Sequence, residues 1–314
     1  MDAYLRGLSF WNRRTEDSLR RAIQYFNQAI AIDPKYALAY SGLANSYALL
    51  GSVGTDGMAP KQAMPLAKAA AQKAIDIDTE LADGHISLAY VNLSYDWDLP
   101  GAAREFSLGL ALNPNSATGH HWYSHYFMAA GDLASATDQM QQALQLEPLS
   151  PSITVGVGWC LYYSRDYDGA IERFRSVVEM DPSLPLGYQT LGMAYQHKGD
   201  LEKAIDAFQK AARFSSNSPA SIAALASALA AAGRPDEAGR ELARLREMSR
   251  SRYVPGIYFA SVYLAMNDLP RTFRWGWTAV GERCDYMMYL RVEPSVASLA
   301  GHPEFVRAMA MLHP

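Results

Sequence analysis

The chain has 314 residues, of which 49% are hydrophobic and 19% are charged, and its net charge is −4. This weak acidity argues against a nucleic-acid-binding surface, because such a surface needs a concentrated basic patch. No apolar run approaches the roughly 18 residues of a membrane helix and the N-terminus has no signal-peptide core, so we expect a cytoplasmic protein without membrane contact.

The N-terminal part contains paired helical patterns. Small and aromatic residues recur at intervals of three and four, which is typical of amphipathic helices. The stretch from Gly51 to Pro65 interrupts the second pair and is rich in Gly, Met and Pro. Two interpretations remain for this insertion: a plain surface loop, or a lip over one end of a groove. Farther on, Asp96 and Asp98 are expected to cap a helix rather than form a metal or acid–base site.

The most informative stretch lies between Asp166 and Ala211. Apolar residues at helical spacing define a first helix with Gly192 at its centre and a second helix with Ala204 and Phe208. Gly192 and Ala204 are small enough to let the two helices cross closely. Gly199 can end the first helix in the left-handed conformation, and Asp200 can cap the second. A helical hairpin is therefore predicted here.

The same pattern recurs every 34 residues. The period links three prolines and four alanines, namely Pro114, Pro148 and Pro182, and Ala136, Ala170, Ala204 and Ala238. A single hairpin cannot bury both of its faces, so neighbouring hairpins must stack on it. The predicted repeats cover residues 2–34, 37–79, 82–115, 117–148, 151–182, 185–216, 219–250 and 253–284, and residues 285–314 form a C-terminal cap that includes a capping helix.

The residues at these positions resemble the tetratricopeptide repeat (TPR) family. Tyr188-x-x-Leu191-Gly192-x-x-Tyr195, followed by Ala204-x-x-x-Phe208, is the signature of that family in its usual order. The resemblance implies an all-α fold, a right-handed superhelix (α-solenoid) of about eight hairpins over residues 1–314. The N-terminal run from Ala3 to Gly51 is similar to the start of TPR tails attached to bacterial multi-domain regulators.

The resemblance also implies that the first helix of each repeat lines a concave groove. The residues of these helices that are not used inside a hairpin then face a partner. Aromatic, Met and His side chains prevail among them, and exposed apolar surface of this kind usually marks binding. The candidate partner-binding residues are Tyr90, Thr118, His121, His125, Met128, Val155, Trp159, Tyr163, Gln189, Met193 and His197.

Alternatives exist for several of these residues. Trp159 and Tyr163 could instead pack against adjacent repeats. His121 and His125 share one helix face, which is metal-ligand spacing, but Trp122 stands where a zinc protease would have its glutamate. We therefore expect no metal site at this pair; groove-lining contacts and structural burial remain the alternatives.

We find no nucleophile elbow, phosphate loop or Cys–His pair with supporting context, so we expect no enzyme activity and no cofactor. The sequence predicts a protein–protein interaction scaffold that binds a peptide or helical segment in its groove. The alternative is a ligand-sensing or regulatory TPR module of a bacterial transcription or signalling system.

Overall fold

The computed structural model describes residues 2–55 and 57–312. Met1, Asp56, His313 and Pro314 belong to the solenoid predicted over 1–314, and they lie outside the described residues. Within the described part the chain is helical and contains no strand. The all-α fold class predicted from the repeats is confirmed.

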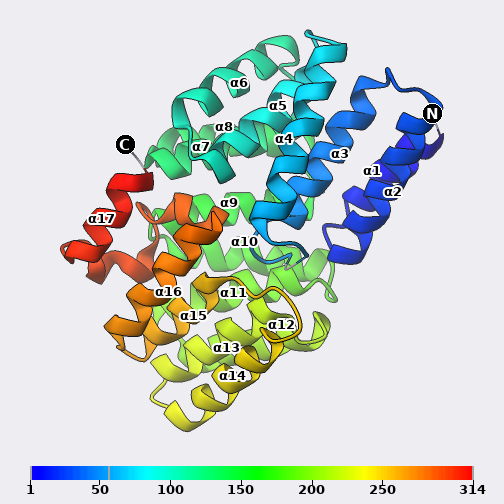
Figure 1. Ribbon diagram of the computed structural model, residues 1–314. Coiled ribbons are helices and arrows are strands. Elements are labelled where there is room, and N and C mark those ends of the chain that lie inside the picture. The colour runs from blue at the N-terminus through cyan, green and yellow to red at the C-terminus, as the bar shows by residue number, and fades with distance from the viewer. Residues whose placement is uncertain (1, 56, 313–314) are drawn as a thin grey trace.

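Consecutive helices form antiparallel hairpins, and the hairpins stack side by side into a right-handed superhelix (Figure 1). The hairpin pairs run from α1/α2 to α15/α16, followed by the terminal helix α17, which packs on α16. The bounds are α1 Asp2–Trp11, α2 Glu16–Ile32, α3 Ala37–Leu50, α4 Pro60–Ile77, α5 Ala82–Val91, α6 Leu99–Leu112, α7 Ala117–Ala130, α8 Leu133–Leu146, α9 Pro151–Tyr163, α10 Tyr167–Met180, α11 Pro185–Lys198, α12 Leu201–Phe214, α13 Pro219–Ala231, α14 Pro235–Met248, α15 Gly256–Ala265, α16 Leu269–Glu282 and α17 Pro303–Leu312. That all of 1–314 forms one solenoid stays a prediction.

The predicted close crossing of α11 and α12 is present. A Cβ atom added at Gly192 would lie 2.6 Å from a ring carbon of Phe208, so only glycine leaves room for this ring. Gly158 and Phe174 repeat the contact one period earlier. Each phenylalanine ring is buried, and the spacing of Gly and Phe thus sets how closely the two helices of a hairpin approach.

The turn between α11 and α12 differs in part from the expectation. Gly199 has φ 93° and ends α11 in the left-handed conformation, as predicted. Asp200, however, makes no side-chain cap on α12; its carboxylate lies 3.1 Å from Lys203 Nζ instead. The corresponding Asp132 and Asp166 do cap their helices. Asp98 also caps a helix, accepting a hydrogen bond from Gly101 N.

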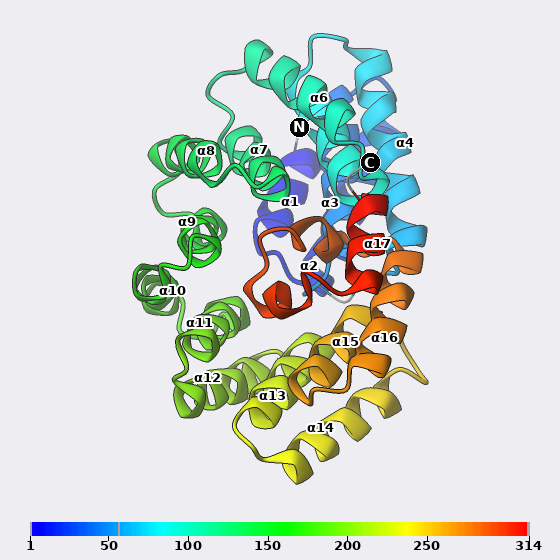
Figure 2. The ribbon, with the colours of Figure 1, turned by 90° about the vertical axis from the view of Figure 1, so that its left-hand side faces the viewer.

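The superhelix curves far enough to bring early and late hairpins together. Glu16 Oε2 at the start of α2 lies 3.6 Å from Arg252 Nη2, just before α15. In the α3–α4 insertion, Gly54 N donates a hydrogen bond of 2.9 Å to the Tyr258 hydroxyl. Figure 2 shows the helices surrounding a central space, and the C-terminal part of the chain runs through this space. The stack is therefore close to a closed ring.

No helix in the described ranges is both long and apolar enough to cross a membrane.

Candidate functional site: the concave face and the C-terminal segment

Residues 284–300, hereafter the C-terminal segment, lie inside the concave face (Figure 2). Most of this segment belongs to the C-terminal cap that the sequence predicts over residues 285–314. It forms two short 3-10 turns, η2 Asp285–Tyr289 and η3 Pro294–Leu299. Pro294 suits the start of η3, and the Glu293 carboxylate caps this turn by accepting a hydrogen bond from Ser295 N. A segment without helical periodicity thus acquires defined geometry inside the solenoid.

Tyr289 anchors the segment to the middle repeats. Its hydroxyl and His125 Nδ1 share a hydrogen bond of 2.8 Å. Its ring stacks on Tyr163, with centroids 5.7 Å apart and 22° between the planes. Burial raises the pKa of Tyr289 well above its usual value, so the hydroxyl keeps its proton at neutral pH. One aromatic side chain therefore connects α7, α9 and the C-terminal segment.

Glu293 is a second anchor, and only 2% of its surface is exposed. Its carboxylate accepts hydrogen bonds from the hydroxyls of Tyr162, at 3.3 Å, and Tyr286, at 2.6 Å. Ser295 donates two more, from its backbone N at 3.0 Å and its hydroxyl at 2.8 Å. Four donors compensate much of the cost of burying this charge. No Lys or Arg of the described chain forms an ion pair with it.

Asp285 joins the segment to the insertion between α3 and α4. Its Oδ1 accepts a hydrogen bond of 3.0 Å from Val53 N. Burial raises the pKa of Asp285 to about 6. Val53 and Gly54 of the insertion therefore contact the C-terminal segment and α15, respectively, and the lip interpretation stays a prediction.

Most of the candidate groove residues contact the C-terminal segment directly or belong to apolar clusters that include residues of this segment. Met288 belongs to the apolar cluster that contains Tyr90, and Val292 to the cluster that contains Met128, Val155 and Tyr163. The buried candidates are Tyr90, His121, Met128, Val155 and Tyr163; Thr118, His125 and Trp159 are half-buried. The middle of the groove is thus filled by the chain's own residues.

Trp159 has a packing role as well as a place in the groove. Its ring lies against Tyr163, with centroids 5.6 Å apart, and edge-on to Phe174 at 5.7 Å. The first contact is within α9 and the second is to the partner helix α10. The alternative interpretation of Trp159 and Tyr163 as packing residues is therefore compatible with their surroundings.

The His121 and His125 rings are adjacent, with centroids 5.1 Å apart. Burial, and secondarily the charge of Arg14, lowers the pKa of His125 to about 4. Burial together with His125 and Arg14 lowers the pKa of His121 well below its usual value. Both imidazoles are therefore neutral at pH 7. Over the described residues, no group of three or more His, Cys, Asp or Glu side chains is arranged to hold a metal ion.

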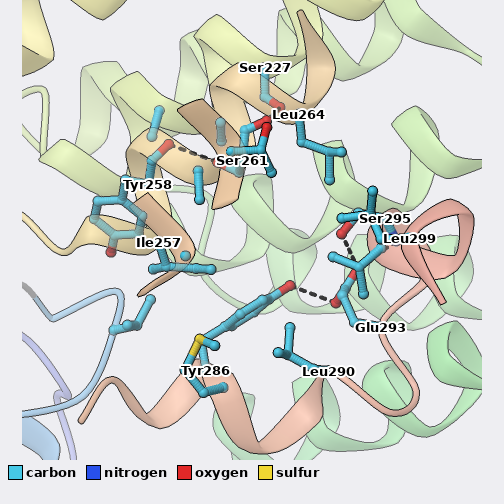
Figure 3. A pocket seen from close by; sticks show the side chains of 18 of the residues that line it. Ser227, Ile257, Tyr258, Ser261, Leu264, Tyr286, Leu290, Glu293, Ser295 and Leu299 are labelled. Carbon is cyan, nitrogen blue, oxygen red and sulfur yellow. Dashed lines mark hydrogen bonds between the residues drawn. The ribbon is translucent and has the colours of Figure 1, made fainter. Parts of the chain in front are cut away.

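The last three candidates, Gln189, Met193 and His197 on α11, line an open pocket. The pocket is lined by residues of α11, α12, α13, α15 and α16, by Val53 of the insertion, and by the C-terminal segment and α17. The cavity measures about 210 Å³. Tyr286 crosses its floor and points toward Glu293 (Figure 3). The concave face therefore has two parts: a filled middle and a pocket beside it.

Tyr289 and Glu293 are not among the groove residues that the sequence predicts, whereas Val53 lies in the insertion for which a lip is one of the two interpretations. The signal available was the apolar run from Tyr286 to Leu290, inside a stretch without helical period. Such an apolar run must be buried against another surface. Because it has no helical period, the sequence does not indicate which surface that is.

Residues 109–250 match the family model described as tetratricopeptide repeat. The chain is 27% identical over 168 residues to the transcriptional regulator HilA of Salmonella typhimurium. That alignment covers 54% of this chain and 30% of the regulator, so the match spans less than a third of the curated relative.

Two solved structures share the fold at low identity. A tetratricopeptide repeat protein from Parabacteroides merdae is 14% identical, with a TM-score of 0.56, over 85% of this chain and 98% of that one. The APC/C hetero-tetramer Cut9–Hcn1 contains a chain that is 15% identical, with a TM-score of 0.58, over 90% of this chain and 49% of that one. These likenesses concern the arrangement of helices alone.

Proposed function

Because the chain is a tetratricopeptide-repeat protein, we propose that it is a protein-interaction scaffold whose concave groove binds a peptide or short helical segment of a partner. The observation that carries this proposal is the position of Tyr289, whose hydroxyl shares a hydrogen bond with His125 and whose ring stacks on Tyr163. A groove that holds a short turn of its own chain through one aromatic anchor has the shape and the polar groups to hold a similar turn from another protein.

The contacts of Tyr289 and Glu293 indicate which side chains a partner segment should present. Tyr289 and Glu293 are four residues apart, and Glu293 N donates a backbone hydrogen bond of 2.9 Å to Tyr289 O, which closes a helical turn. An aromatic hydroxyl and a carboxylate thus project from one turn, toward His125 and Tyr162 respectively. We propose a partner segment that presents the same pair at the same spacing and replaces the C-terminal segment in the groove.

The test uses a fluorescein-labelled peptide that copies residues 284–299, titrated with the full chain while fluorescence anisotropy is followed. The Tyr289→Ala chain has a loosened C-terminal segment, so it should bind the peptide more tightly than the wild type does. Adding Tyr163→Ala to that chain should abolish binding, because the stacking surface for the incoming ring is removed.

Matched peptides serve as controls. Replacing the tyrosine at position 289 or the glutamate at position 293 of the peptide with alanine should weaken binding at least about tenfold. Circular dichroism verifies that each chain variant keeps its helix content. If the folded Tyr289→Ala chain does not bind the peptide, or binds the alanine peptides equally well, the groove is not an exchangeable binding site.

A second candidate function is supported by the similarity to HilA over 54% of this chain. We propose, as an alternative, that the solenoid is a regulatory module of a bacterial transcription or signalling system. An effector domain encoded in the same open reading frame or beside it would support this alternative, and a gene without such a neighbour would count against it.

A further inference from the structure

The pocket beside the C-terminal segment has an unusual charge balance. The titratable side chains that line it include Glu293, Glu304 and His197, and none of the described residues that line it is Lys or Arg. Burial lowers the pKa of His197, which keeps this imidazole neutral at pH 7. Glu304 pairs with Arg307 and accepts the Trp277 Nε1 hydrogen bond of 2.6 Å. Glu293 is thus the charge that lacks a cationic counterpart.

The rest of the pocket is apolar and aromatic. The rings of Phe273, Trp277, Tyr286 and Phe305 line it together with aliphatic side chains. Aromatic faces attract cations, and the attraction grows when water is excluded. A buried carboxylate without a cationic partner favours a positive charge in the adjacent space for the same reason.

The size of the cavity limits the occupant. An engineered apolar cavity of about 150 Å³ holds a benzene molecule, and this cavity measures about 210 Å³. The neighbouring part of the groove is filled by the C-terminal segment, so an extended peptide has no continuous path through both. A small free molecule fits these limits better than a stretch of polypeptide does.

We propose that this pocket binds a small organic cation, an amine with an aromatic or alkyl body somewhat larger than benzene, with its ammonium group directed toward Glu293. The apolar body would lie against Trp277, Tyr286 and Phe305. Because Tyr286, Leu290 and Glu293 belong to the C-terminal segment, the site exists only while this segment occupies the concave face. It requires no protein partner, so the proposal is independent of the proposed function.

The test compares three probes of similar size by isothermal titration calorimetry on the full chain: 2-phenylethylamine, 2-phenylethanol and phenylacetate. The amine should bind at least about tenfold more tightly than the alcohol, and the carboxylate should not bind measurably. In the Glu293→Gln chain, the amine should lose its advantage over the alcohol. Equal affinity of the wild type for amine and alcohol, or no saturable binding of the amine at millimolar concentration, would overturn the proposal.

A second pair of variants keeps the test decisive if Glu293→Gln disturbs the fold. Gly276 lines the pocket, and a Cβ atom there meets no other atom within 4 Å, so we expect the Gly276→Leu side chain to occupy part of the cavity. Gly281 on the same helix has equally open space and does not line the pocket. Gly276→Leu should abolish amine binding and Gly281→Leu should leave it unchanged. Undiminished binding by the Gly276→Leu chain would contradict the assigned site.

Discussion

Tyr289 and His125 are 164 residues apart in the chain, and their side chains share a hydrogen bond of 2.8 Å inside the concave face. The contact links the C-terminal segment to the fourth hairpin across the central space of the superhelix. The groove of this solenoid is thus occupied by the chain's own C-terminal segment. The partner that we propose for the groove would therefore compete with the chain itself, and its affinity would be reduced by the free energy needed to displace the segment.

The first prediction concerns how much Tyr289 contributes to the stability of the fold. Tyr289→Ala removes a buried ring and should lower the free energy of unfolding by about 3 kcal/mol. Tyr289→Phe keeps the ring and removes only the hydrogen bond, so it should cost about 1 kcal/mol. Urea unfolding followed by circular dichroism measures both. Equal losses for the two variants would mean that the stack on Tyr163 contributes nothing.

A second prediction tests the crossing of helices within a hairpin. Gly192→Ala places a methyl group against the buried ring of Phe208 and should destabilise the chain by about 1–3 kcal/mol. Gly239→Ala in α14 is the control, because a Cβ atom there meets no other atom within 4 Å. It should stabilise the chain by about 0.5–1 kcal/mol, since alanine favours helix. A neutral Gly192→Ala variant in thermal unfolding would show that the ring moves aside freely.

The third prediction concerns the loss of folding stability at acidic pH. The pKa of His125 in the folded chain is about 4, below its usual value of 6.5. The unfolded state therefore takes up the proton first, and stability is lost as pH falls from about 6.5 toward 4, by on the order of 3 kcal/mol. His125→Gln removes this titration and can still accept the Tyr289 hydroxyl hydrogen bond. Urea midpoints at several pH values should fall less steeply for the variant; parallel curves for both chains would contradict the burial of a neutral His125.

The ionisation of Asp285 should change the stability with pH in the opposite direction from that of His125. Its folded-state pKa is raised to about 6, so the folded chain binds the proton more tightly than the unfolded chain does. Stability from this group is present at low pH and is lost as pH rises from about 4 through 6, by on the order of 2–3 kcal/mol. Asp285→Asn keeps an acceptor for Val53 N and should be more stable than the wild type at pH 7.5. The exposed Asp206→Asn is the control with little expected change, and a less stable Asp285→Asn chain at pH 7.5 would contradict the prediction.

The repeats could be predicted because their signal is local. Gly192, Gly199 and Phe208 recur with a fixed period, and each has a role within one hairpin that spacing alone defines. The candidate residues of the first helices follow from the same period. The use of these residues as a partner site is still a prediction.

The occupation of the groove could not be predicted in the same way. It depends on the curvature of the superhelix, which is a sum of small rotations from one hairpin to the next. Only this sum brings Glu16 near Arg252 and Val53 near Asp285. The apolar residues between Tyr286 and Val292 carry no period that would indicate their destination, so no local pattern could pair Tyr289 with His125.

Hydrogen exchange on the full chain, with and without saturating peptide 284–299, tests the central claim most directly. We expect the backbone amides of residues 285–293 to exchange slowly in the free chain and to become fast when the peptide binds, while α7 and α9 stay protected. If residues 285–293 stay slow while the peptide is bound, the segment is a permanent part of the core, and the groove is not the partner site that we propose.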